Sequence, residues 1–191
     1  LGKYTTFEPF ADYMKMLDAT KPDAVFVSAP TKFHASIVEE LLKRGIHVFV
    51  EKPFCLKVEQ GEMLTRMANE KGLVNQVGYH NKFIGTFEEV KRILNSGMLG
   101  EIQHFMGEAY GPVVVRKKQG TWRADPEEGG GCLMDYASHV IDLLNYLVAP
   151  IRSVHGALLK PIFSETVEDA VYALLETDTK VSGVLQVNWS D

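Results

Sequence analysis

Short apolar runs alternate with amphipathic stretches through the first half of the chain. The apolar runs are dense in β-branched and aromatic residues, which is typical of strands buried on both faces of a sheet. The amphipathic stretches place apolar residues on one stripe, and a glycine follows each of them closely, as at the end of a helix. The expected strands are 24–28, 46–50 and 73–77, and the expected helices are 34–44, 58–70 and 86–95. This alternation predicts parallel β-α-β units.

The pattern changes after Gly100 and indicates a second domain. Residues 101–110 alternate between polar and apolar positions, and a stretch rich in glycine, proline and charge runs to Gly131. One long helix is expected at 132–148. The strand-like segments behind it are 151–159, 167–176 and 180–189. Hairpin-linked strands with one polar face predict an antiparallel sheet backed by that helix.

Composition and charge limit the kinds of molecule that this chain is expected to bind. The 191 residues include 20 Lys and Arg against 25 Asp and Glu, scattered along the chain, so no nucleic-acid surface is predicted. The apolar runs are far shorter than the roughly 20 residues that cross a bilayer, so no membrane span is expected. Cys55 and Cys132 are far apart, which favours neither a disulfide framework nor a metal site. A reducing, cytoplasmic setting fits best.

Candidate chemistry gathers where the three expected parallel strands end. Because the carboxyl ends of parallel strands meet at one edge of a sheet, ligands bind there. The residues delivered to this edge are Pro30-Thr31, Glu51-Lys52-Pro53 and Gly78-Tyr79-His80-Asn81. The prolines are equally well explained as strand terminators, and Lys52 as a solvated loop lysine. The position of Lys52 directly at a strand end favours a functional role.

The long helix supplies a second group of candidates. Asp135 and His139 are four residues apart, which places them on one helical face. A lone histidine on a helix is more often structural, and a first-turn aspartate can simply favour the helix dipole. The glycine run 129–131 before the helix favours a functional role, because glycine lets the backbone approach a ligand closely.

Taken together, these strings resemble the Gfo/Idh/MocA oxidoreductases. Each string is weak by itself, but their order and separation, over essentially the whole chain, make the set specific. The strings are 23–34, Glu51-Lys52-Pro53, Gly78-Tyr79 and 129–142. The departures from the family pattern are Thr31, Lys82 and Ala137, where Asn, Arg and Gly are common.

The resemblance implies an α/β fold in two parts. Residues 1–99 would be the C-terminal part of a Rossmann-like parallel sheet without its first β-α unit, since no G-x-G-x-x-G turn precedes Tyr4. Residues 100–191 would form part of a substrate-binding and oligomerisation domain, α+β, with an open, mostly antiparallel sheet. We therefore expect a chain truncated at both ends, and a homo-oligomer, a dimer or tetramer, formed through the C-terminal sheet.

The resemblance also implies hydride transfer between NAD or NADP and a hydroxyl-bearing carbon of a sugar, nucleotide-sugar or cyclitol. Lys52 and His139 are the expected catalytic residues, with His139 as general acid/base because an unperturbed imidazole titrates near ~6.5. Asp135 would bind a neighbouring substrate hydroxyl or orient the charged pair. The alternative is a regulator of the same family that senses a dinucleotide or sugar without turnover. Retention of both Lys52 and His139 favours an enzyme.

Further binding residues are expected on both sides of this pair. The cofactor-binding residues implied by the resemblance are Ser28, Pro30, Thr31, His34, Glu51 and Lys52. The substrate-binding residues are Tyr79, Asn81, Trp122, Arg123, Asp135 and His139. A local cap or a surface position for His34, and a loop anchor for Trp122, stay open as alternatives. The basic residues Arg116, Lys117 and Lys118 would bind a substrate diphosphate or form a solvated loop.

Overall fold

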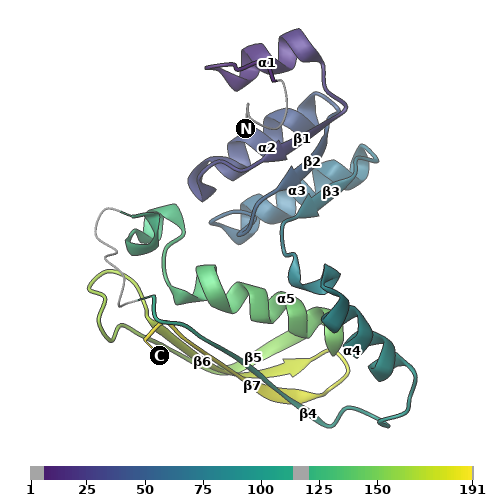
Figure 1. The fold of residues 1–191 in the computed structure, drawn as a ribbon, viewed down its shortest axis with the longest axis vertical. Helices are drawn as coiled ribbons and strands as arrows, with labels where there is room; N and C mark the ends of the chain where they lie inside the picture. The colour runs from purple at the N-terminus through teal and green to yellow at the C-terminus, as the bar shows by residue number, and fades with distance from the viewer. Residues whose placement is uncertain (1–6, 114–120, 191) are drawn as a thin grey trace.

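The computed structural model describes residues 7–113 and 121–190, which form two layered units one above the other (Figure 1). Arg116, Lys117 and Lys118 lie outside the described residues. The elements of the first unit are α1 (Tyr13–Thr20), β1 (Ala24–Val27), η1 (Thr31–Phe33), α2 (His34–Lys43), β2 (His47–Val50), α3 (Val58–Glu70) and β3 (Asn75–Val77). The strands pair in parallel in the order β1-β2-β3, as the alternation of elements predicts.

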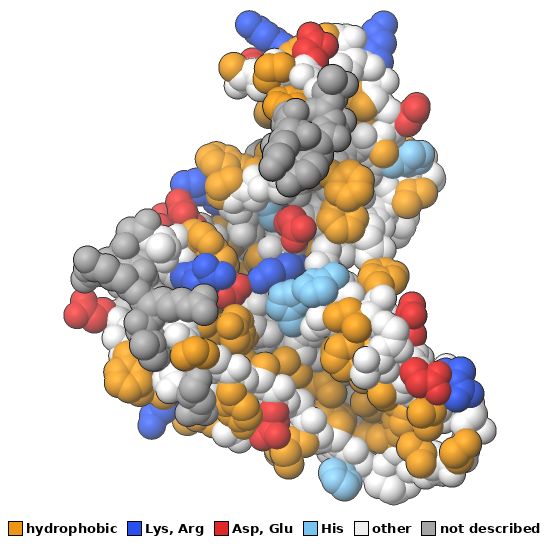
Figure 2. Space-filling view, in the orientation of Figure 1, with side chains coloured by type: hydrophobic (Ala, Val, Ile, Leu, Met, Phe, Trp, Pro, Cys, Tyr) orange, Lys and Arg blue, Asp and Glu red, His pale blue; other side chains and the backbone are white. Residues whose placement is uncertain are grey.

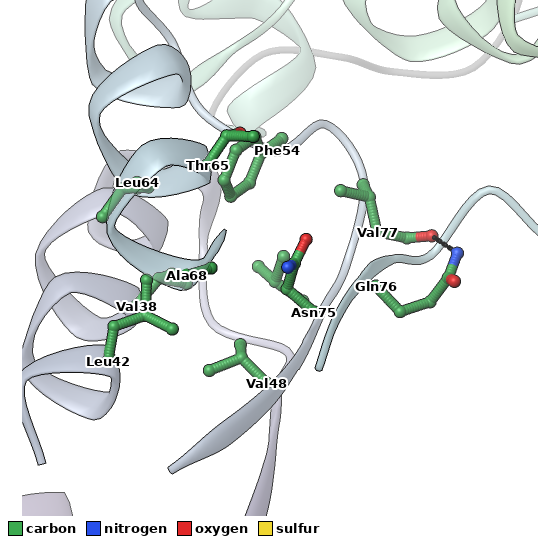
Figure 3. A pocket seen from close by; sticks show the side chains of 11 residues that line it. Val38, Leu42, Val48, Phe54, Leu64, Thr65, Ala68, Asn75, Gln76 and Val77 are labelled. Carbon is green, nitrogen blue, oxygen red and sulfur yellow. Dashed lines mark hydrogen bonds between the residues drawn. The ribbon is translucent and has the colours of Figure 1, made fainter. Parts of the chain in front are cut away.

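The core of the first unit lies between its sheet and the helices α2 and α3. Leu41, Leu42 and Leu64 are almost fully buried there against the inward side chains of β1 and β2. A small apolar pocket within this layer belongs to the core and lies between α2, α3 and the strands β2 and β3 (Figure 3). On the opposite face Phe26 is 77% exposed and stacks on Phe49. The expectation that β1 is buried on both faces is therefore wrong, because no described helix covers this side.

Helix α1 was not expected from the apolar pattern. Asp12 caps its first turn, since Oδ1 accepts a hydrogen bond of 2.8 Å from the backbone N–H of Met14. Leu17 anchors the helix as its one buried residue. A single buried position gives little helical periodicity, which explains why the pattern alone did not indicate this element.

The second unit is a sheet with a helix on one face. Its elements are η2 (Asn81–Phe83), α4 (Gly85–Asn95), β4 (His104–Tyr110), η3 (Trp122–Ala124), η4 (Pro126–Glu128), η5 (Leu133–Ala137), α5 (Ser138–Leu147), β5 (Ile151–Lys160), β6 (Ala170–Thr177) and β7 (Ser182–Asn188). The strand order is β4-β7-β6-β5, with β4 and β7 parallel and the other pairs antiparallel. The expected open, mostly antiparallel sheet is confirmed.

Helix α5 covers one face of this sheet, and Leu144 packs there with Leu185 and Val187. Helix α4 lies beside α5 (Figure 1). The sequence pattern assigned α4 to the first domain, and a boundary at residue 99 stays a prediction. Among the described residues no helix has the length and apolar character needed to cross a bilayer.

Candidate active site

Polar side chains gather in the narrow region between the two units, here called the waist. Basic, acidic and histidine side chains meet there on one face of the molecule (Figure 2). The ends of β1, β2 and β3 reach this waist from the first unit, and the start of the η5–α5 helix reaches it from the second (Figure 1). Ser28, Pro30 and Glu51 are exposed at these strand ends. The expected convergence of strand ends on one edge therefore holds, and the helix of the second unit faces that edge.

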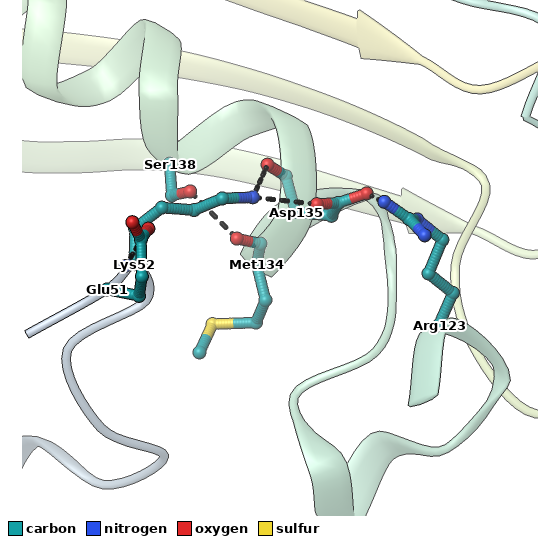
Figure 4. Close-up of polar contacts among 6 residues, drawn as sticks. All are labelled: Glu51, Lys52, Arg123, Met134, Asp135 and Ser138. Carbon is teal, nitrogen blue, oxygen red and sulfur yellow. Dashed lines mark hydrogen bonds and ion pairs between the residues drawn. The ribbon is translucent and has the colours of Figure 1, made fainter. Parts of the chain in front are cut away.

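Lys52 and Asp135 form an ion pair that joins the two units (Figure 4). The Lys52 Nζ donates to Asp135 Oδ1 at 2.8 Å and to the backbone oxygen of Asp135 at 3.2 Å. Arg123 Nε donates to the other carboxylate oxygen at 3.0 Å. The side chain of Asp135 is only 3% exposed, so this buried carboxylate is satisfied by two cations. These contacts favour the orienting role for Asp135 over direct binding of a substrate hydroxyl.

Asp135 lies in a π-helical turn, not in the regular α-helix that the apolar pattern predicted. The backbone N–H of Ser138 bonds to the oxygen of Leu133 five residues back, and regular α-helix begins only at Ser138. Asp135 thus lies in the π turn that leads directly into the regular α-helix carrying His139. Short π segments within helices are frequently found at functional sites.

His139 sits against two aromatic rings at the mouth of the waist. Its ring makes edge contacts with Tyr79 and His80, each with centroids 5.6 Å apart. Burial lowers the pKa of His139, and the nearby positive charge of Lys52 lowers it further. At neutral pH the imidazole is therefore uncharged and able to accept a proton. Lys52 is therefore close enough to His139 to act on it electrostatically.

Two residues expected to bind the cofactor are instead buried within the protein. His34 is 1% exposed, and its ring nitrogens face the backbone oxygens of Pro53 at 2.9 Å and Ala29 at 2.7 Å. His34 is therefore neither a helix cap nor a surface residue, and its ring ties the end of β1 to the loop that carries Lys52. Thr31 is 9% exposed and packs beside Gly129 of the second unit.

The remaining expected substrate residues border the waist. The guanidinium of Arg123 stacks on the ring of Trp122, with its central carbon 4.6 Å from the ring centroid. Asn81 and His139 line the same groove between α5 and β4. Burial raises the pKa of Tyr79, so its hydroxyl stays protonated and can donate a hydrogen bond. Trp122 supports Arg123, which fits the loop-anchor alternative for this ring.

The glycine run packs tightly against the protein itself, and its expected role in the approach of a ligand stays a prediction. A Cβ on Gly130 would lie 2.6 Å from the backbone oxygen of Arg123. A Cβ on Gly131, where φ is +100°, would collide with the carboxylate of Glu168. That carboxylate accepts a 2.8 Å hydrogen bond from the backbone N–H of Leu133 and so caps the start of the η5–α5 helix.

Gly131→Ala is therefore expected to destabilise the fold by about 2–3 kcal/mol, from the positive φ together with displacement of the Glu168 cap. Gly97→Ala is the matched control, because Gly97 has φ +72° and a Cβ added there would meet nothing within 4 Å. We expect about 1 kcal/mol for this control. Denaturant unfolding of both variants measures the difference. Equal losses would contradict a role for Glu168 in the packing around residue 131.

Three contacts of the site were missed by the sequence reasoning. Lys82 and Asp142 form an ion pair of 2.8 Å between η2 and α5, and His80 lies against His139. The signal for Asp142 was its spacing of three residues from His139, which puts both on one face of a helix. Glu168 carried no signal, because its contact with Leu133 spans 35 residues of sequence.

Comparison with known protein families identifies the family of this chain. The model of the GFO/IDH/MocA C-terminal domain matches residues 87–191, and the model of an oxidoreductase family with an NAD-binding Rossmann fold matches residues 1–79. The chain belongs to the GFO/IDH/MocA oxidoreductase family. The resemblance noted in the sequence is thereby confirmed, and so is the Rossmann-like character of the first sheet.

Individual GFO/IDH/MocA relatives are similar along nearly the whole chain. The scyllo-inositol 2-dehydrogenase (NAD(+)) of Bacillus subtilis is 28% identical over 93% of this chain and 52% of its own length. The dTDP-3,4-didehydro-2,6-dideoxy-alpha-D-glucose 3-reductase of Actinomadura kijaniata is 30% identical over 93% and 53%. The WlbA dehydrogenase of Bordetella pertussis, solved with NADH and UDP-GlcNAcA, superposes with a TM-score of 0.87 at 27% identity, covering 96% of this chain and 54% of that one. The chain spans about half the length of these relatives.

Proposed function

We propose that this chain carries the catalytic centre of an NAD(P)-dependent oxidoreductase acting on a hydroxyl-bearing carbon of a sugar, nucleotide-sugar or cyclitol. The observation that carries the proposal is the Lys52–Asp135 ion pair at 2.8 Å, which holds an amine from a Rossmann-type strand end beside the helix that bears His139. A cation near a neutral imidazole suits alcohol oxidation, because the cation stabilises the developing oxyanion and the imidazole takes the hydroxyl proton.

The strand ends fit the nicotinamide half of a dinucleotide. Ser28, Pro30 and Glu51 are exposed around Lys52, so backbone and side-chain groups there are open to a ligand. Gly78 lies at the same edge of the sheet and packs closely against Glu51, because a Cβ added to Gly78 would lie 3.0 Å from the Glu51 carboxylate. The nicotinamide, when bound, accepts or supplies the hydride. These residues give no preference between NAD and NADP.

In this proposal Lys52 and His139 divide the work on the reacting hydroxyl. Lys52 donates a hydrogen bond to the substrate oxygen and stabilises the negative charge that develops there as the hydride leaves. His139, uncharged because burial lowers its pKa, takes the hydroxyl proton. Asp135 holds the Lys52 ammonium in place through a charge-assisted hydrogen bond. Reduction of a carbonyl uses the same groups in reverse.

The relatives support the substrate class. Their names include an inositol dehydrogenase, a dTDP-sugar reductase and the D-glucoside 3-dehydrogenase of Escherichia coli. These names denote a cyclitol, a nucleotide-linked keto sugar and a glucoside, and a waist lined by carboxylate, amine, imidazole and aromatic groups suits polar rings of this kind. None of these names supports the regulator that senses ligands without turnover.

The direct test is cofactor turnover by the longest natural protein that contains this sequence, here called the parent protein. We expect reduced nicotinamide to form when NAD or NADP is combined with a panel of inositols, free sugars and nucleotide-sugars. Calorimetric titration with each dinucleotide accompanies this assay. Binding without turnover on any substrate would favour the regulator, and the absence of both binding and turnover would favour an inert domain.

We also propose that the chain forms a homo-oligomer through the uncovered face of the second sheet. That face carries large exposed apolar side chains, and a contiguous apolar surface of this kind marks an interface. Its members are Met106, Leu158, Leu174 and Val184. The expected cytoplasmic location stays a prediction.

Leu174→Glu should shift the parent protein from an oligomer towards a monomer, because the charge would be buried in the interface. Leu174 is 48% exposed in β6, near the centre of the sheet. Met98→Glu is the matched control, since Met98 is 76% exposed outside this face. Sedimentation velocity measures both. An unchanged mass for Leu174→Glu would place the interface elsewhere.

A further inference from the structure

The ion pair between Lys82 and Asp142 lies directly behind His139. Lys82 Nζ donates to Asp142 Oδ1 at 2.8 Å, linking η2 to α5 across 60 residues of sequence. The two side chains are 24% and 18% exposed, so the pair is largely shielded from solvent. Only one carboxylate oxygen of Asp142 is used in this contact.

Two buried polar atoms beside this pair have no hydrogen-bond partner within the described part of the chain: Asp142 Oδ2 and His139 Nδ1. A buried carboxylate oxygen is an acceptor, and a ring nitrogen that carries hydrogen is a donor. Leaving either unsatisfied costs about 1–3 kcal/mol, so a partner is expected for each. The two atoms have complementary hydrogen-bonding character.

Helix geometry brings these two side chains together. His139 and Asp142 are three residues apart in α5, so they are neighbours on one helical face. Helical side chains lean towards the N-terminus of their helix, which directs Asp142 towards His139. Nδ1 is the ring nitrogen nearer to the backbone of α5, and Nε2 is the one farther from it.

We infer that Asp142, held by Lys82, is a positioning residue that accepts the Nδ1 hydrogen of His139 and so leaves Nε2 free to take the substrate proton. The inference rests on the proposed function for its catalytic meaning, but the contact itself is independent of it. A base whose far nitrogen is bound to a carboxylate has its tautomer and ring orientation set before substrate arrives. Hydrogen bonds of this kind often tighten only in the substrate complex.

The charged groups around His139 determine in which direction the pKa of His139 moves when one of them is removed. Lys52 and His80 lower the pKa of His139, whereas Asp135 and Asp142 raise it. Removal of the Asp142 charge should therefore lower the pKa of His139 further. The removal should also weaken the preference for hydrogen on Nδ1, because an asparagine can offer a donor where the carboxylate offers only acceptors.

The test is Asp142→Asn in the parent protein, with the state of His139 followed by nitrogen-detected NMR of the imidazole and by the pH profile of kcat/KM. We expect the Nδ1–H form to dominate in the wild type and to decline in the variant, with a lower His139 pKa. We expect kcat to fall about 10- to 100-fold with KM changed less, the range seen when the carboxylate partner of a metal-bound histidine is removed. Asp18→Asn is the matched control, because Asp18 is ion-paired with Arg44 in the first unit.

Lys82→Met tests whether Asp142 positions His139 or whether the Lys82–Asp142 pair only tethers η2 to α5. If Asp142 acts on His139, Lys82→Met should leave the His139 tautomer on Nδ1 while lowering kcat less than Asp142→Asn does. An unchanged tautomer and pKa of His139 in Asp142→Asn would overturn the inference. That result would leave the proposed function intact, because the latter fails only if turnover is absent in the wild type.

Discussion

Lys52→Met is expected to lower kcat/KM of the parent protein by about 10²- to 10³-fold, the range measured for loss of one donor that stabilises a developing oxyanion. The reason is that the Lys52 ammonium is already aimed into the waist by Asp135 at 2.8 Å, so its charge is in place before the reaction starts. Initial rates with the substrate identified in the panel measure the effect. Lys43→Met is the control, because Lys43 forms an exposed ion pair with Glu39 on α2.

Lys52→Met also leaves the buried carboxylate of Asp135 with one cation, Arg123, instead of two. This loss would lower the stability of the fold as well as the activity. The double variant Lys52→Met/Asp135→Asn removes that unpaired charge. We expect it to recover stability and to remain inactive. Recovery of activity in the double variant would show that Lys52 acts only through the fold, contrary to the role proposed for it.

His139→Gln is expected to lower kcat by about 10²- to 10⁴-fold, the contribution of a well-placed general base. Burial and the charge of Lys52 lower the pKa of His139, so the uncharged, proton-accepting form persists below the ordinary imidazole range. In wild-type protein the acidic limb of kcat/KM against pH should therefore have its midpoint below about 6.5. In His139→Gln that limb should disappear.

His155→Gln provides the control for this profile, because His155 is a half-exposed histidine on β5 that lies 3.8 Å from Glu176. We expect it to leave both the rate and the acidic limb unchanged. An acidic limb that survives in His139→Gln would assign the titrating base to another residue.

The part of the site contributed by strand ends was predictable from local pattern alone. The alternation of apolar runs and amphipathic helices required parallel strands, and parallel strands bring Lys52 and Tyr79 to one edge. The strand and helix bounds follow from side-chain periodicity and agree within three residues at each end for the first unit. These features depend only on residues close together in sequence.

The contacts across the waist were not predictable in the same way. Lys52 meets Asp135 over 83 residues of sequence, and no local pattern relates two charges so far apart. The π turn at Leu133–Ala137 was expected to be regular helix, because one extra residue in a turn hardly alters apolar spacing. His34 was misassigned for a related reason: a histidine at a helix start looks the same whether its ring faces a ligand or two backbone oxygens.

A crystal structure of the parent protein with a reduced nicotinamide cofactor and a bound polyol tests the central claim most directly. We predict one hydroxyl oxygen within about 2.6–3.2 Å of both Lys52 Nζ and His139 Nε2, with its carbon facing the nicotinamide ring. A polyol bound away from the waist, or one whose oxygens contact neither residue, would contradict this prediction.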